Sequence, residues 1–291
     1  MTQFAGAIAH VETAGAGYPI LCLHGHPGRG RSMGVFVEHL APRYRTIAPD
    51  LRGYGRSQVS APFVMHDHLD DLTALLDRLD IERCLLVGWS LGGILALESI
   101  LAQPQRFSGT ILVASAARPR GTHPPISKLD LLYTGIAGVL NWLKPGWEWN
   151  IQQFGQRSLF RYLVQQHTPA TYRYLAEEGV AAYLQTSRHA QQALDRAIRA
   201  GYDRSANLNR IEVPCLVLMG AEDRHIAAAA SRATADLLPD CQWCCYPDTA
   251  HLFPWEVPVR VLDDVDAWLH ARPDVVGGCS ERSRAGANGP S

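Results

Sequence analysis

The sequence lacks any long uninterrupted run of apolar residues. No stretch reaches the roughly 18 apolar residues that suggest a membrane-crossing helix. The first residues, MTQFAGAIAHVETAGAG, contain no basic segment followed by a long apolar one. We therefore expect no membrane span and no secretory leader, and we take the cytoplasm as the default location.

An excess of charge of either sign is also missing. The 291 residues include 27 Lys plus Arg and 28 Asp plus Glu, which gives a formal net charge of −1 at pH 7. Such a balance creates no strong field that would attract nucleic acid or anionic lipid. We predict no nucleic-acid partner and a small-molecule ligand, and the sequence leaves the oligomeric state open.

The chain has seven cysteines but no pattern that requires a disulfide or a metal. Cys22, Cys84 and Cys215 fall in apolar runs typical of buried strands, where a thiol behaves as a small hydrophobic group. The run CQWCCY at 241–246 places its cysteines on both faces of a strand, and no second CxxC or HxxxH follows. We expect no metal at this run.

Short apolar runs alternate with segments of helical spacing. The runs occur at residues 20–23, 45–48, 84–87, 110–113 and 215–219, and their continuity is typical of strands buried on both faces of a parallel sheet. Leucine and isoleucine recur at helical spacing over 69–79 and 94–101. This order predicts an α/β fold with a mostly parallel, twisted sheet flanked by helices.

The alternation stops between residues 118 and 206, which are rich in aromatic residues and helix formers. We predict that 118–206 is an inserted helical lid, that 1–117 and 207–272 form the core, and that 273–291 is a disordered tail. Trp142 and Trp147 of the lid, together with Trp89, are candidates for the substrate pocket. Most lid aromatics are expected to pack the lid itself.

Residues 88–92, GWSLG, match G-x-S-x-G between a predicted strand and a predicted helix. Such a turn is so sharp that small residues are needed two before and two after the serine, and Gly88 and Gly92 supply them. Ser90 would then lie at a helix N-terminus, where N–H groups and the helix dipole favour negative charge. We predict Ser90 as a nucleophile. The alternative is a glycine-rich turn with an incidental serine.

Two further motifs precede GWSLGG, namely HGHPG at 24–28 and DLRGYGRS at 50–57. The three motifs occur in this order at the ends of predicted strands, and over roughly residues 8–270 the chain resembles the α/β-hydrolase superfamily. The resemblance implies an α/β-hydrolase fold with an inserted helical lid and a serine hydrolase of the carboxylesterase type. It also assigns the oxyanion hole to the backbone N–H groups of His26 and Leu91.

A serine hydroxyl is a weak nucleophile at neutral pH and needs a histidine base held by an acid. The family order of nucleophile, acid and base favours His251, which follows the last predicted strand, and Asp223, which follows the strand at 215–219. Glu222 and Asp248 are weaker candidates for the acid. No proline follows Asp223 as it does in the commoner family pattern, and 114–117 offer no alternative carboxylate.

We expect the enzyme to cleave carboxylic esters of small to medium, largely uncharged, partly hydrophobic substrates through an acyl-enzyme on Ser90, with no cofactor and no metal. A lactonase, a thioesterase or a carrier-protein methyl esterase could use the same triad. A non-catalytic ligand-binding homologue would keep the fold without the reaction.

Two other classes are weighed against these. A metallohydrolase is weakly suggested by His24, His26 and the run His66, Asp67 and His68, although these pieces lie far apart in the chain. Epoxide hydrolases and haloalkane dehalogenases share related loop motifs but need a carboxylate nucleophile, and Ser90 occupies that place.

Overall fold

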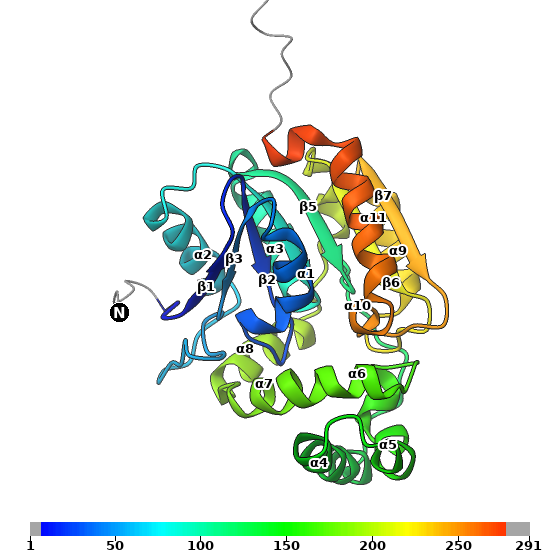
Figure 1. The fold of residues 1–291 in the computed structure, drawn as a ribbon. Helices are drawn as coiled ribbons and strands as arrows, with labels where there is room; N and C mark the ends of the chain where they lie inside the picture. The colour runs from blue at the N-terminus through cyan, green and yellow to red at the C-terminus, as the bar shows by residue number, and fades with distance from the viewer. Residues whose placement is uncertain (1–6, 278–291) are drawn as a thin grey trace, which may run out of the picture.

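The computed structural model describes residues 7–277. A twisted seven-stranded sheet lies at its centre, with the order β1-β3-β2-β4-β5-β6-β7 (Figure 1). β1 is antiparallel to β3, and all other neighbouring strands are parallel, so the predicted mostly parallel sheet is confirmed. The strands are β1 (Val11–Ala14), β2 (Pro19–Leu23), β3 (Arg45–Pro49), β4 (Cys84–Trp89), β5 (Phe107–Val113), β6 (Cys215–Gly220) and β7 (Cys241–Tyr246).

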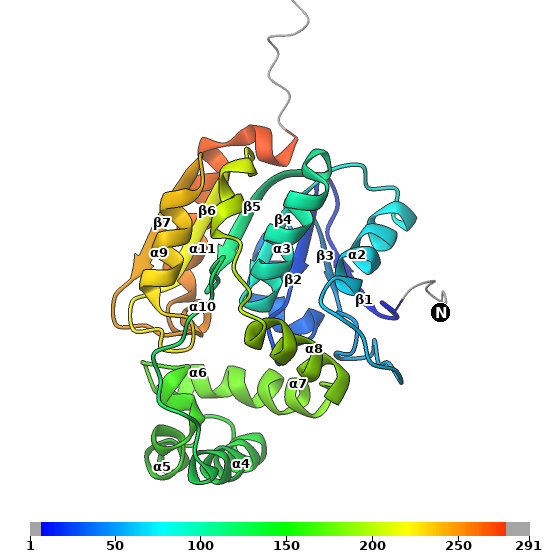
Figure 2. The same ribbon diagram turned by 180° about the vertical axis from the view of Figure 1, so that it is seen from behind.

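Helices cover both faces of the sheet. On one face lie α1 and α11 (Figure 1), and on the other lie α2, α3 and α9 (Figure 2). The flanking helices are α1 (Gly34–Leu40), α2 (Asp67–Arg78), α3 (Leu91–Ala102), α9 (Ala228–Leu237), α10 (Phe253–Glu256) and α11 (Pro258–Ala271). Because both faces are covered, successive residues of a strand enter two different cores: Leu21 and Leu23 of β2 face one, and Ile20 and Cys22 face the other.

The cysteines of the described chain are free thiols. Burial raises the pKa of Cys22 and of Cys84 to about 12, so both thiols stay neutral inside the sheet. In β7 the side chains alternate as expected: Cys241 packs on one core and Cys244 on the other. Cys279 lies outside the described residues.

Residues 114–214, all of which the structure describes, form helices and loops and no strand. We call residues 118–206 the cap. The cap lies across the carboxyl ends of the parallel strands (Figure 1). Its helices are α4 (Lys128–Leu143), α5 (Glu148–Gln153), α6 (Pro169–Tyr174), α7 (Val180–Leu184) and α8 (Arg188–Arg199), and a π-helical turn (Leu175–Gly179) joins α6 to α7.

Short 3-10 turns complete the chain. They span Gly30–Met33, Pro104–Arg106, Gly155–Arg157, Leu159–Tyr162, Ser205–Arg210 and Pro273–Val276. The last of these corrects the prediction of a disordered tail from 273: Val275 is fully buried, and the Ser108 hydroxyl donates to its carbonyl at 2.6 Å. Val275 and Val276 both pack on the core, with Val275 beside Gly109 near the start of β5, so the turn is held against the sheet. Residues 278–291 of the predicted tail lie outside the described residues.

Within residues 7–277, no helix combines the length and the apolar character needed to cross a bilayer.

Candidate active site

Ser90 occupies the turn between β4 and α3, with φ of 53° and ψ of −111°. A positive φ is unfavourable for a residue that carries a side chain, so the surroundings must hold this conformation. The Ser90 N–H donates to the Val113 carbonyl at 2.8 Å, and the Ser115 hydroxyl donates to the Ser90 carbonyl at 2.9 Å. The end of β5 therefore fixes the backbone of the turn.

Gly88 and Gly92 provide the clearance that the turn needs. A Cβ on Gly88 would lie 2.4 Å from the carbonyl oxygen of Gly92, and a Cβ on Gly92 would lie 2.0 Å from that of Leu23 in β2. Both contacts are with backbone, which cannot move aside as a flexible side chain does. Only glycine fits at these two positions.

Asp223 and His251 form a buried hydrogen-bonded pair. The Nδ1 of His251 lies 2.8 Å from Oδ2 of Asp223, and both side chains are almost inaccessible to solvent. The other oxygen of Asp223, Oδ1, accepts the backbone N–H groups of His225 at 2.8 Å and Ile226 at 3.0 Å. An ionised carboxylate only accepts, so His251 must carry its proton on Nδ1, which leaves the lone pair on Nε2.

The alternative acids do not reach the base. Glu222 and Asp248 are exposed, and the carboxylate that bonds to His251 among the described residues is that of Asp223. Asp223 is thus the carboxylate that the fold brings to His251.

Ser90 lies in the same buried cluster as this pair. Its neighbour Trp89 places its ring 6.0 Å from the ring of His251, and Ser90 itself is 6% exposed. Among residues 7–277 the Ser90 hydroxyl has no hydrogen-bond partner, so the structure joins Asp223 to His251 and leaves the hydroxyl unbonded.

The HGHPG loop lies directly beside Ser90. Leu23 of β2 is paired with Gly88 of β4, and a Cβ on Gly25 would lie 3.3 Å from the Cβ of Ser90. The backbone N–H of His26 follows in this loop, and that of Leu91 is the first of α3. Within the described chain neither amide donates to another protein acceptor, so both are free for a ligand oxygen.

Buried polar groups hold this loop in place. His24 Nε2 accepts the Leu51 N–H at 3.1 Å while its Nδ1 lies 2.8 Å from the Gly25 carbonyl, and burial lowers the pKa of His24 to about 4. Asp50 accepts the N–H groups of Gly30 and Arg56, each at 2.7 Å. His24 and Asp50 thus connect the two loops.

The side chain of His26 is also engaged. Its Nδ1 lies 2.9 Å from the Tyr54 hydroxyl, and burial lowers its pKa to about 4. The weakly suggested metal ligands do not converge: within residues 7–277, no three His, Cys, Asp or Glu side chains are grouped as a metal site requires. Asp67 instead begins α2, and its carboxylate accepts the Val64 N–H at 2.9 Å.

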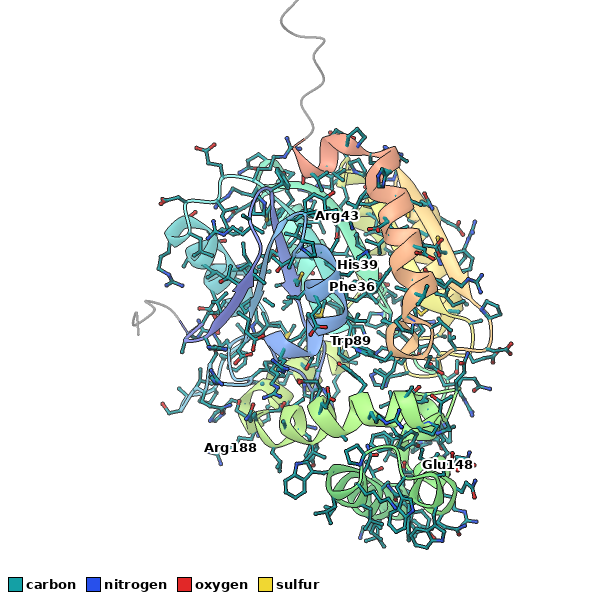
Figure 3. All side chains as sticks on the ribbon, in the orientation of Figure 1. Phe36, His39, Arg43, Trp89, Glu148 and Arg188 are labelled. Atoms are coloured by element: carbon teal, nitrogen blue, oxygen red, sulfur yellow. The ribbon has the colours of Figure 1, made fainter. Side chains whose placement is uncertain are left out.

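Of the three tryptophans expected in the pocket, the structure places only Trp89 beside the acid–base pair. Trp89 lies where the cap meets the core (Figure 3). Trp142 is 62% exposed on α4, and Trp147 packs against Lys144 and Trp149. The segment α6–α7 separates α4 from the core (Figures 1 and 2), so the structure does not bring Trp142 and Trp147 together with Trp89.

Three aromatic side chains near the pair were not predicted. Trp255 contacts Trp89 at 4.7 Å between ring centroids, Tyr174 of the cap stacks on Trp255 at 4.2 Å, and His225 contacts His251 at 4.8 Å. The spacing of four residues between His251 and Trp255, typical of one helical turn, is the sequence feature that could have placed Trp255 near the pair. No sequence feature could have placed Tyr174 there, because its position depends on how the cap folds over the core.

Glu256 ties the cap to the loop that carries His251. One of its oxygens accepts the Ala250 N–H at 2.8 Å, and the other accepts those of Gln165 at 2.9 Å and Gln166 at 2.5 Å. Burial raises the pKa of Glu256 although the three N–H donors oppose the shift. A further backbone bond joins Leu252 to the Leu163 carbonyl of the cap.

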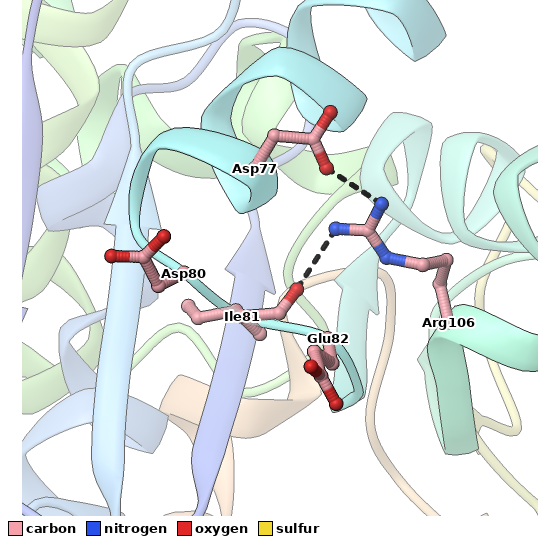
Figure 4. Close-up of a pocket in the computed structure, with 5 residues that line it drawn as sticks. All are labelled: Asp77, Asp80, Ile81, Glu82 and Arg106. Atoms are coloured by element: carbon pink, nitrogen blue, oxygen red, sulfur yellow. Dashed lines mark hydrogen bonds and ion pairs between the residues drawn. The ribbon is translucent and has the colours of Figure 1, made fainter.

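Two cavities of the structure lie away from Ser90. One, of about 320 Å³, is lined by Asp77, Asp80, Ile81, Glu82 and Arg106, with Arg106 bonded to Asp77 and to the Ile81 carbonyl (Figure 4). This cavity lies at the amino end of β4, and Ser90 follows the carboxyl end of the same strand. At the usual rise per residue, the length of β4 separates the two by about 20 Å. The second, of about 350 Å³, lies between α2, α3 and α8.

The comparisons with known proteins match this architecture. The family model described as alpha/beta hydrolase fold matches residues 18–258. The chain belongs to this family. The pimeloyl-[acyl-carrier protein] methyl ester esterase of Nitrosomonas europaea is 27% identical to this α/β-hydrolase over 90% of the chain and 99% of the relative.

Two further relatives span most of the α/β-hydrolase chain. The 2-hydroxymuconate semialdehyde hydrolase of Pseudomonas sp. (strain CF600) is 28% identical over 91% of both chains. The solved structure of a thermophilic esterase from Thermogutta terrifontis is 28% identical, with a TM-score of 0.65 over 90% of this chain and 93% of that one. The resemblance to the α/β-hydrolase superfamily and the fold class expected from the sequence are confirmed.

Proposed function

We propose that this α/β-hydrolase is a serine esterase in which Ser90 is the nucleophile, His251 the general base and Asp223 the acid that orients it. The observation that carries the proposal is the buried Asp223–His251 hydrogen bond of 2.8 Å beside a serine at positive φ. A carboxylate that holds Nδ1–H leaves Nε2 ready to accept the serine proton.

The proposed reaction has two halves. The Ser90 oxygen attacks the ester carbonyl as His251 Nε2 takes its proton, and the N–H groups of His26 and Leu91 stabilise the oxyanion. The tetrahedral intermediate expels the alcohol, which receives the proton from His251 and leaves an acyl-enzyme. Water then attacks the acyl carbonyl with His251 again as base, and Ser90 departs with the proton. No step calls for a metal or a cofactor.

The surroundings of Ser90 support an uncharged, partly hydrophobic substrate. Trp89, Trp255 and Tyr174 supply aromatic surface beside the pair, and burial keeps His26 neutral at pH 7 because its pKa is about 4. Arg29 is already bonded to Glu178 at 2.9 Å, so it is a poor clamp for a substrate carboxylate. We propose that the cap acts as a lid over this surface and shields the acyl-enzyme from bulk water.

The methyl ester of a carrier-bound acyl chain is the second candidate substrate. The Nitrosomonas europaea relative, named for that activity, is covered over 99% of its length. Lactones and thioesters can be cleaved by the same triad and remain alternatives within the mechanism. A non-catalytic ligand-binding protein is the alternative from another class.

A substrate panel tests the proposal. Purified protein is assayed with p-nitrophenyl acetate, butyrate and octanoate, a methyl ester, a lactone and a thioester, in parallel with Ser90→Ala. We expect turnover of at least the short and medium p-nitrophenyl esters and none by the variant. The esterase proposal is wrong if wild-type protein that reacts with a fluorophosphonate leaves all the esters untouched.

A further inference from the structure

The helix α4 of the cap has its polar residues inside and its apolar residues outside. Its buried positions are Asp130, Ala137 and Asn141. Its outer positions follow the spacing of one helix face, and the large hydrophobic side chains among them are each 54–65% exposed. They are Leu129, Leu131, Leu132, Val139, Trp142 and Leu143.

This orientation is fixed by hydrogen bonds of the inner residues. Asp130 caps the helix through Ser127 and pairs with Arg161 at 2.6 Å. Asn141 donates to the Tyr172 carbonyl at 2.6 Å and accepts the Gly146 N–H at 3.0 Å. Rotating α4 to bury its leucines would leave these polar groups without partners, which is costly. The apolar face therefore stays outward.

The face continues beyond α4. Of the fourteen large hydrophobic side chains exposed in the described residues, eleven belong to the cap. α7, which packs against α4, adds Tyr183 and Leu184, and α5 adds Trp149. α4 and α5 form the end of the molecule farthest from the sheet, and α7 lies between α4 and the core (Figures 1 and 2). An exposed apolar face of this kind marks an interaction surface.

The charges on the face indicate its partner. Lys128 and Lys144 lie at the two ends of α4, both exposed, and the acid within the helix, Asp130, is buried against Arg161. The exposed acids on neighbouring cap segments are Glu148 of α5 and Glu177 of the π-helical turn. The cap as a whole has eleven Lys or Arg against six Asp or Glu, although the net charge of the chain is −1. An apolar face with cationic ends complements an apolar surface that carries negative charge.

A second copy of this chain fits the face poorly. In a two-fold dimer the same surface meets itself, so a contact along α4 places Lys128 or Lys144 opposite a lysine of the other copy in either direction. No exposed acid on α4 neutralises them. A lipid surface with anionic headgroups satisfies both the lysines and the hydrophobic side chains, and the exposed indole of Trp142 is suited to the membrane–water interface.

We propose that the cap docks on an anionic lipid surface through the outer face of α4 and the adjoining residues Trp149, Tyr183 and Leu184. The docking is peripheral, since the face belongs to amphipathic helices lying on the outside of the fold. It brings a cap that covers Ser90 next to a lipid phase. The proposal concerns binding alone and does not depend on the proposed esterase activity.

The test is co-sedimentation of the full chain with vesicles of phosphatidylcholine, with and without phosphatidylglycerol. We expect binding to the anionic vesicles. The double variant Leu132→Ser/Trp142→Ser should bind at least about tenfold more weakly, because it removes two apolar side chains from the contact. The matched control Leu237→Ser/Val259→Ser changes two exposed residues outside the cap and should bind as wild type.

A further double variant separates charge from apolar contact. Lys128→Gln/Lys144→Gln should weaken binding to anionic vesicles by about tenfold or more, and added salt should abolish this difference. Circular dichroism and thermal melting confirm that each variant is folded. The proposal is overturned by three results: no binding of wild type, equal binding of the Leu132/Trp142 variant, or a lipid-free dimer in sedimentation velocity that this variant dissociates.

Discussion

At the scale of single residues, the two oxygens of Asp223 have different partners. Oδ1 accepts two backbone N–H groups from its own loop, and Oδ2 is left for Nδ1 of His251. The loop therefore points one oxygen at the imidazole and prevents the carboxylate from turning. In this arrangement the acid sets the tautomer of His251, and the tautomer decides whether Nε2 accepts a proton.

The first prediction concerns this tautomer. In Asp223→Asn the amide oxygen keeps the bonds to His225 and Ile226 while the NH₂ faces His251, so Nδ1 must accept and Nε2 must carry the proton. We expect kcat for a p-nitrophenyl ester to fall by about 10⁴ with the fold intact. The exposed neighbour provides the control, because Glu222→Gln should stay within about twofold of wild type. Equal losses in the two variants would remove Asp223 from its proposed role.

The second prediction concerns the space beside Ser90. Gly92→Ala would force a Cβ to 2.0 Å from the Leu23 carbonyl oxygen, and we expect the free energy of unfolding to drop by about 3 kcal/mol. The control is Gly135→Ala on α4, where an added Cβ meets nothing within 4 Å; it should be neutral or stabilising by about 0.5–1 kcal/mol. Urea denaturation measures both. Similar stability of the two variants would contradict the account of the turn.

At the scale of secondary-structure elements, strands that are buried on both faces were recognisable from sequence. The apolar runs correspond to β2, β3, β4, β5 and β6, because full burial demands side chains without charge. The edge strand β1, VETA, was not predicted, since it has four residues and only partial burial. The antiparallel pairing of its backbone with β3, rather than the burial of its side chains, holds β1 in the sheet.

The same reasoning explains what could be predicted of the site. Ser90, Asp223 and His251 each follow a strand, and parallel strands end at one edge of the sheet, so their meeting was predictable from chain order. The positions of Trp142 and Trp147 were not. The hydrophobicity of α4 gave no sign that the inner face would hold Asp130 and Asn141, because this depends on partners in other cap segments.

The third prediction concerns the connection between cap and core. Glu256→Gln replaces one acceptor oxygen with an NH₂ that must face backbone N–H groups, either at Ala250 beside His251 or at Gln165 and Gln166 in the cap. We expect kcat/KM to fall about tenfold and the melting temperature to drop by several degrees. Glu148→Gln, exposed on the cap, is the control. An unchanged kcat/KM despite a lower melting temperature would show that Glu256 anchors the cap without positioning His251.

At the scale of the whole molecule, stability depends on histidines that are buried in their neutral form. Burial lowers the pKa of His24 to about 4 and that of His68 to about 3. The unfolded chain protonates near pH 6.5, so between pH 6.5 and 4 the unfolded state binds more protons than the folded one. The contribution of these groups is complete above pH 6.5 and is lost progressively as the pH falls.

The fourth prediction follows from this linkage. The free energy of unfolding, measured by urea denaturation, should fall as the pH is lowered from about 7 to 4.5, by about 2 kcal/mol for each such histidine. His68 is surrounded by Tyr54 and Phe63, so His68→Phe should reduce the slope. The exposed His66→Phe is the control and should keep it. A slope unchanged by His68→Phe would remove that residue from the explanation.

The central claim is that Ser90 is the residue that forms the covalent intermediate. Its most direct test is intact-protein and peptide mass spectrometry after reaction with a fluorophosphonate. We expect one adduct per wild-type chain, located on the peptide that contains Ser90, and no adduct on folded Ser90→Ala, whose kcat should be lower by about 10⁶. No adduct on wild type, an adduct elsewhere, or a variant that keeps substantial esterase activity would contradict it.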